Sequence, residues 1–550
     1  MAVVLAVSGG FRTTVGGFRI SARSPLAASI AALIAGAAWV ALARRDRAIA
    51  ADLEGMWHAI ERHSSRLIGV VALIAAIVAS TFATRSAAGA DASGYLSQSA
   101  MWRIVQPAIY FEGLAQEFEL LDGWITTPLG WRPLAQGEYV AGAQVPTYPP
   151  GLPLLMTVPH AVAGIKGATA VVIASAPVAV WATGMLAGGA AGILAAALLA
   201  FSPVFLYQSF QPMSDVPVTA AWIMSFLLVE RRSTWAGIAC AIAVLVRPNL
   251  APLALIPLLV TKSKIGFAIP VAIAAGFLAV VQLMWYGSPL RSGYGTADEL
   301  FAWANIGPNA LRYLNWLMAT APVLLLALFG FWRTSQAASR KPQALGLFAV
   351  LVIVSYLMYA VFDDWAYLRF LLPAMAVFAV FAAIELVAWI ERWPLAVRVL
   401  LFFTLILGVT AYSLIVARTF DTFKLADQLR RVEQAAAFID RSSPRNAVLI
   451  AGEQSGSMRY YTGRSILRWE AATADQLSKA ITTLAQRPMY VALDAWENEP
   501  FLAKFKDVPA VALDWPPLVE AGTSHRTRVW NLADRDRFLK GEHIETIRVP

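Results

Sequence analysis

The sequence predicts a polytopic α-helical membrane protein with about eleven or twelve transmembrane helices and a C-terminal soluble α/β domain. Of its 550 residues, 58% are hydrophobic and 14% are charged, a composition that excludes an ordinary soluble protein. The charges are segregated, because 18 of the 44 basic and 17 of the 35 acidic residues lie in residues 419–550. A polar stretch with six acids, residues 85–151, also interrupts the apolar sequence. Such a long stretch is rarely structureless in a compact protein unless it is functional.

These changes in composition divide the chain into three parts. Residues 1–66 form an N-terminal segment, in which Leu26–Ala43 is just long enough to span a membrane and a basic cytoplasmic connector follows. Residues 67–418 form the expected transmembrane domain, and this domain includes the polar loop 85–151. Residues 419–550 form the expected soluble domain.

Basic residues predict which face of the membrane each loop occupies. Clusters of bases follow the positive-inside rule if they lie in the cytoplasm: Arg231-Arg232, Lys262 with Lys264, and Arg333 with Arg340 and Lys341. Loop 85–151 and the C-terminal domain are then expected together on the outer face. In this arrangement Ser202–Val216 is a second outer loop, and Trp316–Trp332 crosses the membrane as one helix.

The C-terminal domain alternates helical and strand-like patterns, which is typical of a small α/β domain. Two helices are expected, at Lys424–Asp440 and Ala474–Gln486. Three strands are expected, at Ala447–Ala451, Met489–Asp494 and Arg526–Leu532.

Two acids at the expected outer face are candidates for chemistry. Asp91 follows a spanning helix by about seven residues, amid small residues that would let a substrate approach its carboxylate. It could act as a base or orient an acceptor, or it could simply cap a helix. Asp215 precedes an apolar helix, and its local sequence alone favours an N-cap.

Two arginines, Arg247 and Arg369, lie at outer ends of expected helices, against the positive-inside bias. Such residues usually face a polar cavity or a partner, and a guanidinium binds phosphate oxygens in a bidentate manner. The alternative for Arg369 is an ion pair with Asp363 or Asp364. The alternative for Arg247 is an extended side chain that reaches the lipid head groups.

Several familiar sites are not indicated. The five histidines form no ligand-spaced pair, and Cys240 is the only cysteine, so a cysteine-based metal site is excluded. The sequence has no Walker motif, dinucleotide fingerprint or Gly-x-Ser-x-Gly, so a nucleotide as the direct energy source has no support. We expect neither a metal nor a cofactor.

The order of four motifs resembles the C-type (GT-C) membrane glycosyltransferases, over roughly residues 67–420. These motifs are Asp91 in the first outer loop, Tyr148-Pro149-Pro150-Gly151 before the next apolar run, Ser202-Pro203 with Ser214-Asp215, and Arg369-Phe370-Leu371-Leu372-Pro373 at a late helix. The most similar groups are lipid A aminoarabinose transferase and its relatives, protein O-mannosyltransferases and rhizobial galacturonosyltransferases.

The resemblance implies transfer of a sugar from a polyprenyl-phosphate donor, with inversion at the anomeric carbon. Asp91 matches the catalytic acid, Asp215 and the neighbouring Tyr95 match acceptor- or metal-proximal positions, and Arg369 matches the arginine that holds the donor phosphate. Arg247 is a second candidate for that phosphate. Because Ala92-Ser93 rather than a second acid follows Asp91, metal-independent transfer is expected.

The resemblance also implies a location and partners. The enzyme would lie in the bacterial inner (plasma) membrane, with its site and C-terminal domain facing the periplasm. Its acceptor would be an envelope glycolipid or polysaccharide. Three other functions stay open: a protein O-glycosyltransferase, a transporter or flippase of lipid-linked sugars, and a non-catalytic partner in envelope assembly. A transporter would favour inverted repeats and intramembrane charges, and the sequence shows no internal symmetry.

Overall fold

The computed structural model describes residues 11–15, 18–22, 34–36, 38, 41–42, 47–104, 110–111, 114, 123–134, 143–336 and 339–549. Most of Leu26–Ala43 lies outside these ranges, and so do five of the six acids of loop 85–151, which are Glu112, Glu117, Glu119, Asp122 and Glu138. Near the N-terminus, β1 (Phe11–Val15) and β2 (Phe18–Ala22) pair as an antiparallel hairpin. An amphipathic helix, α3 (Arg47–Arg62), follows before the first described span.

The described part of the chain contains many apolar helices. Five are long enough to cross a membrane: α4 (Ser64–Phe82), α7 (Gly151–Ala187), α13 (Lys264–Tyr286), η5 with α18 (Trp365–Ile390) and α19 (Leu395–Thr419). Two more are bent pairs: α8 (Gly189–Ala200) with α9 (Pro203–Ser209), and η3–α15 (Trp303–Thr320) with η4–α16 (Pro322–Ser335). Four are shorter: α10 (Asp215–Leu228), α11 (Ser233–Val246), η2–α12 (Pro248–Val260) and α17 (Lys341–Leu357). By length, five to seven of the described segments could cross a membrane, and the four shorter helices bring the number of apolar segments to eleven.

Helix α4 shows why these segments belong in a membrane. Its buried residues, Ile68, Ala72, Ala75 and Ala79, recur at helical spacing and face the other helices. The opposite face is also apolar, since Val70, Leu73 and Ile77 are more than half exposed. A helix that is apolar on both its packed and its exposed face is stable in lipid rather than in water.

Breaks in the helices correct two expectations. Trp316–Trp332 is not one straight crossing, because the helix pair there bends by 111° at Ala321. Ala321 leaves the helical region (φ −155°, ψ 57°), since the following residue, Pro322, disfavours helical backbone before it. Likewise, Ser202–Val216 is not an open loop: it contains the buried helix α9, which begins at Pro203 and bends 63° from α8.

The centre of the membrane part is a bundle in which α7, α8, α10 and α18 pack against one another, with α4 and α11 beside them. Helix α8 is rich in alanine and glycine and buried along most of its length. A methyl group added at Gly184 of α7 or Gly192 of α8 would overlap with the backbone of the other residue, so these glycines allow the two helices to approach closely.

The C-terminal α/β domain is a six-stranded sheet with the strand order β11-β9-β10-β8-β6-β7. Its strands are β6 (Val448–Ala451), β7 (Ser465–Arg468), β8 (Met489–Asp494), β9 (Val519–Ala521), β10 (Thr527–Asn531) and β11 (Ile547–Val549). Its longer helices are α20 (Leu425–Ser442), α21 (Ser455–Thr462), α22 (Ala474–Thr483) and α23 (Asn498–Lys504). Alternate residues of β6 enter two apolar clusters, one against α20 and one against α22 and α23, so both faces of the sheet are covered.

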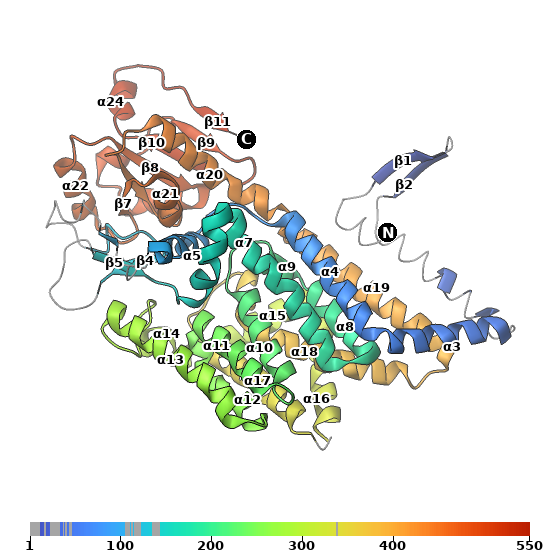
Figure 1. Cartoon of the computed structure of the whole chain (residues 1–550). Helices are drawn as coiled ribbons and strands as arrows, with labels where there is room; N and C mark the ends of the chain where they lie inside the picture. The colour runs from blue at the N-terminus through green and yellow to red at the C-terminus, as the bar shows by residue number, and fades with distance from the viewer. Residues whose placement is uncertain are drawn as a thin grey trace.

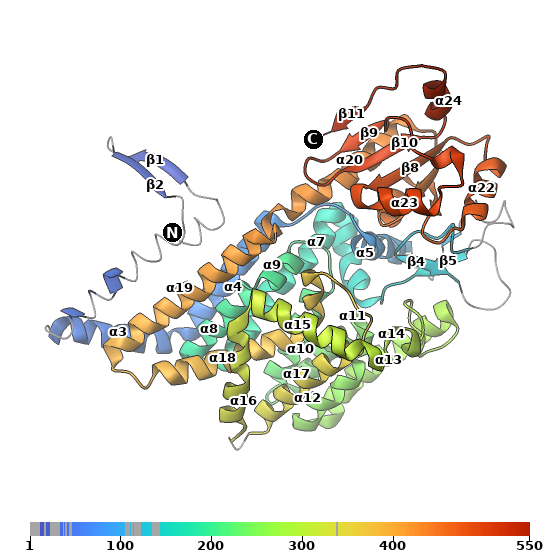
Figure 2. The same ribbon diagram turned by 180° about the vertical axis from the view of Figure 1, so that it is seen from behind.

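The polar loop lies directly beneath this domain, as Figures 1 and 2 show. It forms helix α5 (Ala90–Met101), the turn η1 (Trp102–Ile104) and a three-stranded sheet of β3 (Tyr110–Phe111), β5 (Ala143–Pro146) and β4 (Trp131–Pro133). The long helix α19 leads from the membrane part up to α20 (Figure 1). The loop and the C-terminal domain therefore meet on one side of the membrane helices, as the sequence predicted.

Candidate active site

Asp91 lies in the first turn of α5, and the backbone at Gly89 brings the chain into that turn. Gly89 has φ 81°, in the region that favours glycine, and it occupies the N-cap position. Gly89, and not Asp91, is the N-cap residue, so Asp91 does not occupy the cap position. The carboxylate instead stays 29% exposed and points to a cation.

That cation is Arg369. Its Nη2 donates to Asp91 Oδ2 at 2.8 Å, although 278 residues separate the two in sequence. The expected alternative partners have other roles: Asp363 pairs with Arg312 at 3.1 Å, and Asp364 accepts from the Ala366 amide at 2.7 Å. The ion-pair alternative for Arg369 is therefore wrong, because its guanidinium turns toward α5.

Arg247 and Asp215 form a second, more deeply buried pair. Arg247 Nη2 donates to Asp215 Oδ1 at 2.6 Å and to Ser214 Oγ at 3.2 Å. Ser214 is the N-cap residue of α10, and Asp215 is the first residue of the helix, so the N-cap interpretation of Asp215 is wrong. The Arg247 side chain is therefore paired with Asp215 and does not extend to the lipid head groups. Phe370 lies near both cations, with ring-to-guanidinium distances of 5.8 Å to Arg247 and 5.4 Å to Arg369.

Two tyrosines place neutral hydroxyls beside Asp91. Tyr95 and Tyr148 are each 4% exposed, and their rings lie 4.7 Å apart. Burial, and after it the charge of Asp91, raises the pKa of both phenols, so both keep their proton at neutral pH. Two protonated phenols therefore lie near the Asp91 carboxylate.

The Tyr148-Pro149-Pro150-Gly151 motif connects these groups to the membrane helices. Its two prolines line the cavity described below, and Gly151 begins α7. A methyl group at Gly151 would overlap with the backbone of Leu245 and Val246, which immediately precede Arg247. The motif therefore fixes the position of Tyr148 relative to the turn at Arg247. Similarly, Gly94 makes room for the Tyr148 ring, so at this position the small residues beside Asp91 serve packing rather than substrate access.

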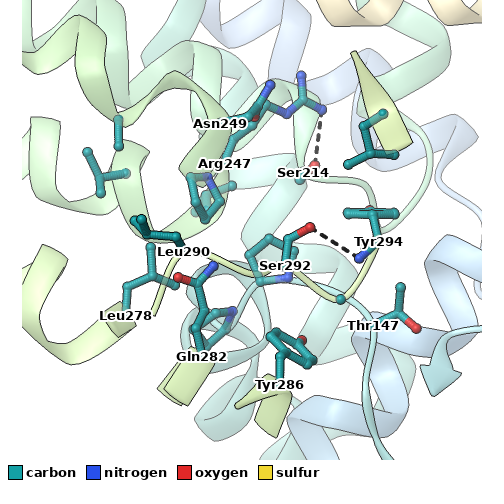
Figure 3. Close-up of a pocket in the computed structure, with 18 of the residues that line it drawn as sticks. Thr147, Ser214, Arg247, Asn249, Leu278, Gln282, Tyr286, Leu290, Ser292 and Tyr294 are labelled. Carbon is teal, nitrogen blue, oxygen red and sulfur yellow. Dashed lines mark hydrogen bonds between the residues drawn. The ribbon is translucent and has the colours of Figure 1, made fainter. Parts of the chain in front are cut away.

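The two ion pairs share one cavity of about 510 Å³. Its polar lining includes Asp91, Tyr95, Ser214, Asp215, Arg247 and Arg369. Its apolar lining includes residues of α13, among them Ala275, Leu278, Val281 and Trp285. Figure 3 shows Leu278 and Gln282 on this helix and Arg247 with its bond to Ser214. The far face of α13 is apolar and exposed, with Ile269 and Ile273 more than half accessible.

Hydrogen-bonding capacity remains in the polar lining. Arg369 Nε, Arg247 Nη1 and Asp215 Oδ2 are buried and make no hydrogen bond to any residue that the structure describes. An unpaired buried N–H is costly, and a guanidinium prefers the oxygens of phosphate or carboxylate. The arrangement is therefore suited to an anionic group at the cations, close to a carboxylate that can accept a proton.

Some residues of the site were not indicated by the sequence. Tyr294 packs its ring 5.8 Å from Tyr148 and lines the cavity from the loop after α13. Tyr356, on α17, lies 6.0 Å from the Arg247 guanidinium and accepts a hydrogen bond from Asn249 at 3.0 Å. Both are single tyrosines in segments without a motif. The only signal for Tyr294 was its place in Gly287–Asn315, a segment that the positive-inside rule puts on the outer face, and Tyr356 on α17 had no signal.

In the described ranges, no group of three or more His, Cys, Asp or Glu side chains is arranged to hold a metal ion. The two carboxylates of the site each face an arginine instead.

No model of a known protein family matches the chain, and no curated protein matches it in sequence. Among solved structures, the crystal structure of ArnT from Cupriavidus metallidurans in the apo state is similar, with a TM-score of 0.48 and 14% identity, over 85% of this chain and 97% of that chain. The structure of the same protein bound to undecaprenyl phosphate has a TM-score of 0.48 and 12% identity, over 84% and 97% of the two chains. ArnT is a lipid A aminoarabinose transferase of the GT-C kind, the class that the sequence motifs resemble. Neither similarity assigns an activity or a ligand to this chain.

Proposed function

We propose that this protein is a membrane glycosyltransferase that moves a sugar from a polyprenyl-phosphate donor to a hydroxyl of an envelope glycolipid or polysaccharide. The observation that carries the proposal is the position of the Asp91–Arg369 pair. The pair lines a cavity that is also lined by apolar residues of α13. The opposite face of α13 is apolar and exposed, as expected for a helix in contact with lipid. A lipid-linked phosphate has the same two-part character.

The donor fits the cavity in one direction. Its phosphate would lie between Arg247 and Arg369, where buried N–H groups are still free to donate. Its polyprenyl chain would follow the apolar residues of α13 toward the membrane. Phe370, in contact with both guanidiniums, would keep the two cations at a fixed spacing. A pocket of mostly apolar lining with a few convergent polar groups is the usual form of such a site.

The transfer step follows from these positions. Asp91 accepts the proton of the acceptor hydroxyl as its oxygen forms a bond to the anomeric carbon. The bond from that carbon to the phosphate oxygen breaks, and its electron pair leaves with the phosphate, which gains one negative charge. Arg369 and Arg247 stabilise this charge. Attack from the face opposite the phosphate inverts the anomeric configuration. The step is balanced without a metal.

We infer the sidedness from the basic clusters, which are cytoplasmic by the positive-inside rule. The site and the C-terminal domain then face the periplasm of a bacterial inner membrane.

The proposal is tested by incubating the purified protein with labelled polyprenyl-phosphate sugars and an extract of envelope lipids. We expect label in a new product that requires both donor and acceptor, with inverted anomeric configuration. Label found only in glycosylated protein would identify a protein O-glycosyltransferase. Translocation of the donor across proteoliposomes without any product would show a transporter. Loss of envelope product in cells, with neither transfer nor translocation in vitro, would indicate an assembly partner.

A further inference from the structure

The C-terminal domain contacts the segment around Asp91, residues 87–101, mainly through one short helix, α21. Its N-terminal residues meet two backbone groups of the polar loop. Gly89 N, at the start of α5, donates to Gln454 Oε1 at 2.9 Å, and Leu129 N, just before β4, donates to Ser455 Oγ at 3.0 Å. Near the C-terminal end of α21, the Tyr461 hydroxyl accepts a hydrogen bond from Ala87 N, just before α5, at 2.7 Å. These are bonds to backbone groups around Asp91, so they act on its position rather than on substrate.

The far end of α5 is held by the same helix. Tyr460 lies 3.1 Å from His160 Nε2, and His160 Nδ1 lies 2.7 Å from Ser99 Oγ on α5. Ser99 is fully buried and His160 is 5% exposed, so this chain of hydrogen bonds is shielded from water. Helix α21 is thus connected to both ends of the helix that carries Asp91.

The fit between the two helices is close. A methyl group at Gly456 would overlap with the Leu129 carbonyl and the Ser93 hydroxyl, while Ser93 itself donates to Gly89 O at 2.7 Å. No larger side chain can occupy position 456 unless α5 and the C-terminal domain separate.

Gln454 has a fixed orientation because of what lies behind it. Its Nε2 donates to Asp494 Oδ2 at 2.9 Å, and Asp494 also accepts two bonds from Arg431, at 3.0 and 3.2 Å. An ionised carboxylate only accepts, so the amide nitrogen must face Asp494 and the amide oxygen must face Gly89. Asp494 and Arg431 are 0% and 4% exposed, which makes this a rigid anchor inside the domain.

We propose that α21 of the C-terminal domain is the positioning element of the active site, and that Gln454 is its principal positioning residue. Its side-chain amide bonds to the rigid Arg431–Asp494 pair on one side and to the Gly89 amide on the other. It therefore fixes the backbone two residues before Asp91. The domain is then part of the active-site scaffold rather than a separate appendage. The kinetic part of this proposal rests on the transfer reaction proposed above. The structural part does not.

The test combines hydrogen exchange of the full-length protein with transfer kinetics for three variants. Gln454→Met removes the bond to Gly89, Tyr461→Phe removes the bond to Ala87, and Gly456→Ala opposes the close fit. Two matched controls lie far away: Tyr412→Phe loses a bond to Ala319 O, and Gly408→Ala adds a methyl group in open space.

We expect exchange in residues 87–101 to rise about tenfold in Gln454→Met and about three- to tenfold in Tyr461→Phe, as loss of one hydrogen bond implies. The strands of the C-terminal sheet should keep their exchange rates. The kcat should fall by similar factors, and the donor KM should change less than about twofold. The controls should match the wild type in every readout.

Three results would overturn the proposal. Unchanged exchange in residues 87–101 would show that α21 does not hold the segment. A rise spread evenly over the C-terminal sheet would show a merely structural role for Gln454. A local rise with unchanged kcat would show that the held position is irrelevant to transfer. If the wild type transfers no sugar, the proposed function fails, and the exchange results still decide the structural part.

Discussion

The two Asp–Arg pairs have the same chemistry in different surroundings. Asp215 and Arg247 have side chains that are 1% and 11% exposed, with a bond of 2.6 Å. Asp91 and Arg369 are 29% and 14% exposed, with a bond of 2.8 Å. Both pairs line the same cavity. The difference is that the Asp91 carboxylate is much more exposed than the Asp215 carboxylate.

This difference separates structural from chemical roles. Burying two charges costs free energy that their attraction only partly offsets, so a broken buried pair leaves an uncompensated charge. An exposed carboxylate can exchange its partner for solvent or substrate at little cost. We therefore expect Asp215 to hold Arg247 in place and Asp91 to react.

Breaking the buried pair should have the largest effect on stability. Asp215→Asn leaves the Arg247 guanidinium uncompensated, and we expect a loss of about 3–5 kcal/mol in the free energy of unfolding. Thermal unfolding of the purified protein in detergent measures this loss. The double variant Asp215→Asn with Arg247→Gln should recover part of it. A melting temperature equal to that of the wild type would mean that the pair is not structural.

Arg369→Lys should have the next largest effect, and on activity. Lysine keeps the charge beside Asp91 but loses the planar fork and the free Nε, so donor phosphate is held by a single point charge. We expect kcat/KM for the donor to fall about ten- to a hundredfold while the melting temperature changes little. Arg312→Lys is the matched control, because it alters an exposed pair away from the cavity. Equal values of kcat/KM for the two variants would show that Arg369 does not bind the donor.

Tyr148→Phe should have a smaller effect. The ring that packs on Gly94 and Tyr95 stays, and only the hydroxyl near Asp91 is lost. Loss of one polar contact to a carboxylate costs about 1.5 kcal/mol, so we expect kcat to fall about tenfold. An unchanged kcat would show that this hydroxyl does not act on Asp91.

Arg312→Ala should have the smallest effect. Its partner Asp363 is 83% exposed, and an exposed pair contributes less than about 0.5 kcal/mol. We expect the melting temperature and the transfer rate to stay within error of the wild type. A clear loss in either would mean that exposure does not distinguish the pairs as argued above.

Much of the fold could be predicted from the sequence because it depends on local patterns. The helices at Leu425–Ser442 and Ala474–Thr483 and the strand at Met489–Asp494 match their expected positions, since each has a clear apolar period. Helix α21 was missed. Its sequence, SGSMRYYT, is short and mostly polar, and it gives the apolar core only Met458 among its fully buried apolar residues, so it has no clear apolar period. The bend at Ala321 was missed because Pro322 lies inside an otherwise continuous apolar run.

The sequence singled out four residues of the cavity separately and did not predict how they pair. Asp91, Asp215, Arg247 and Arg369 all line this one cavity. Which acid meets which base depends on the packing of helices distant in sequence. Near neighbours such as Asp363 were the natural candidates for Arg369, yet the fold brings Asp91 to it from the other end of the chain.

The most direct measurement is the transfer rate of Asp91→Asn against the wild type, at matched amounts of folded protein. Asparagine has almost the same size and cannot accept the proton. Because a general base contributes about 10²–10⁴-fold, we predict a loss of at least a hundredfold with an unchanged melting temperature. A folded variant that keeps more than about a tenth of the wild-type rate would contradict the role of Asp91 as the base, and with it the assignment of this cavity as the catalytic site.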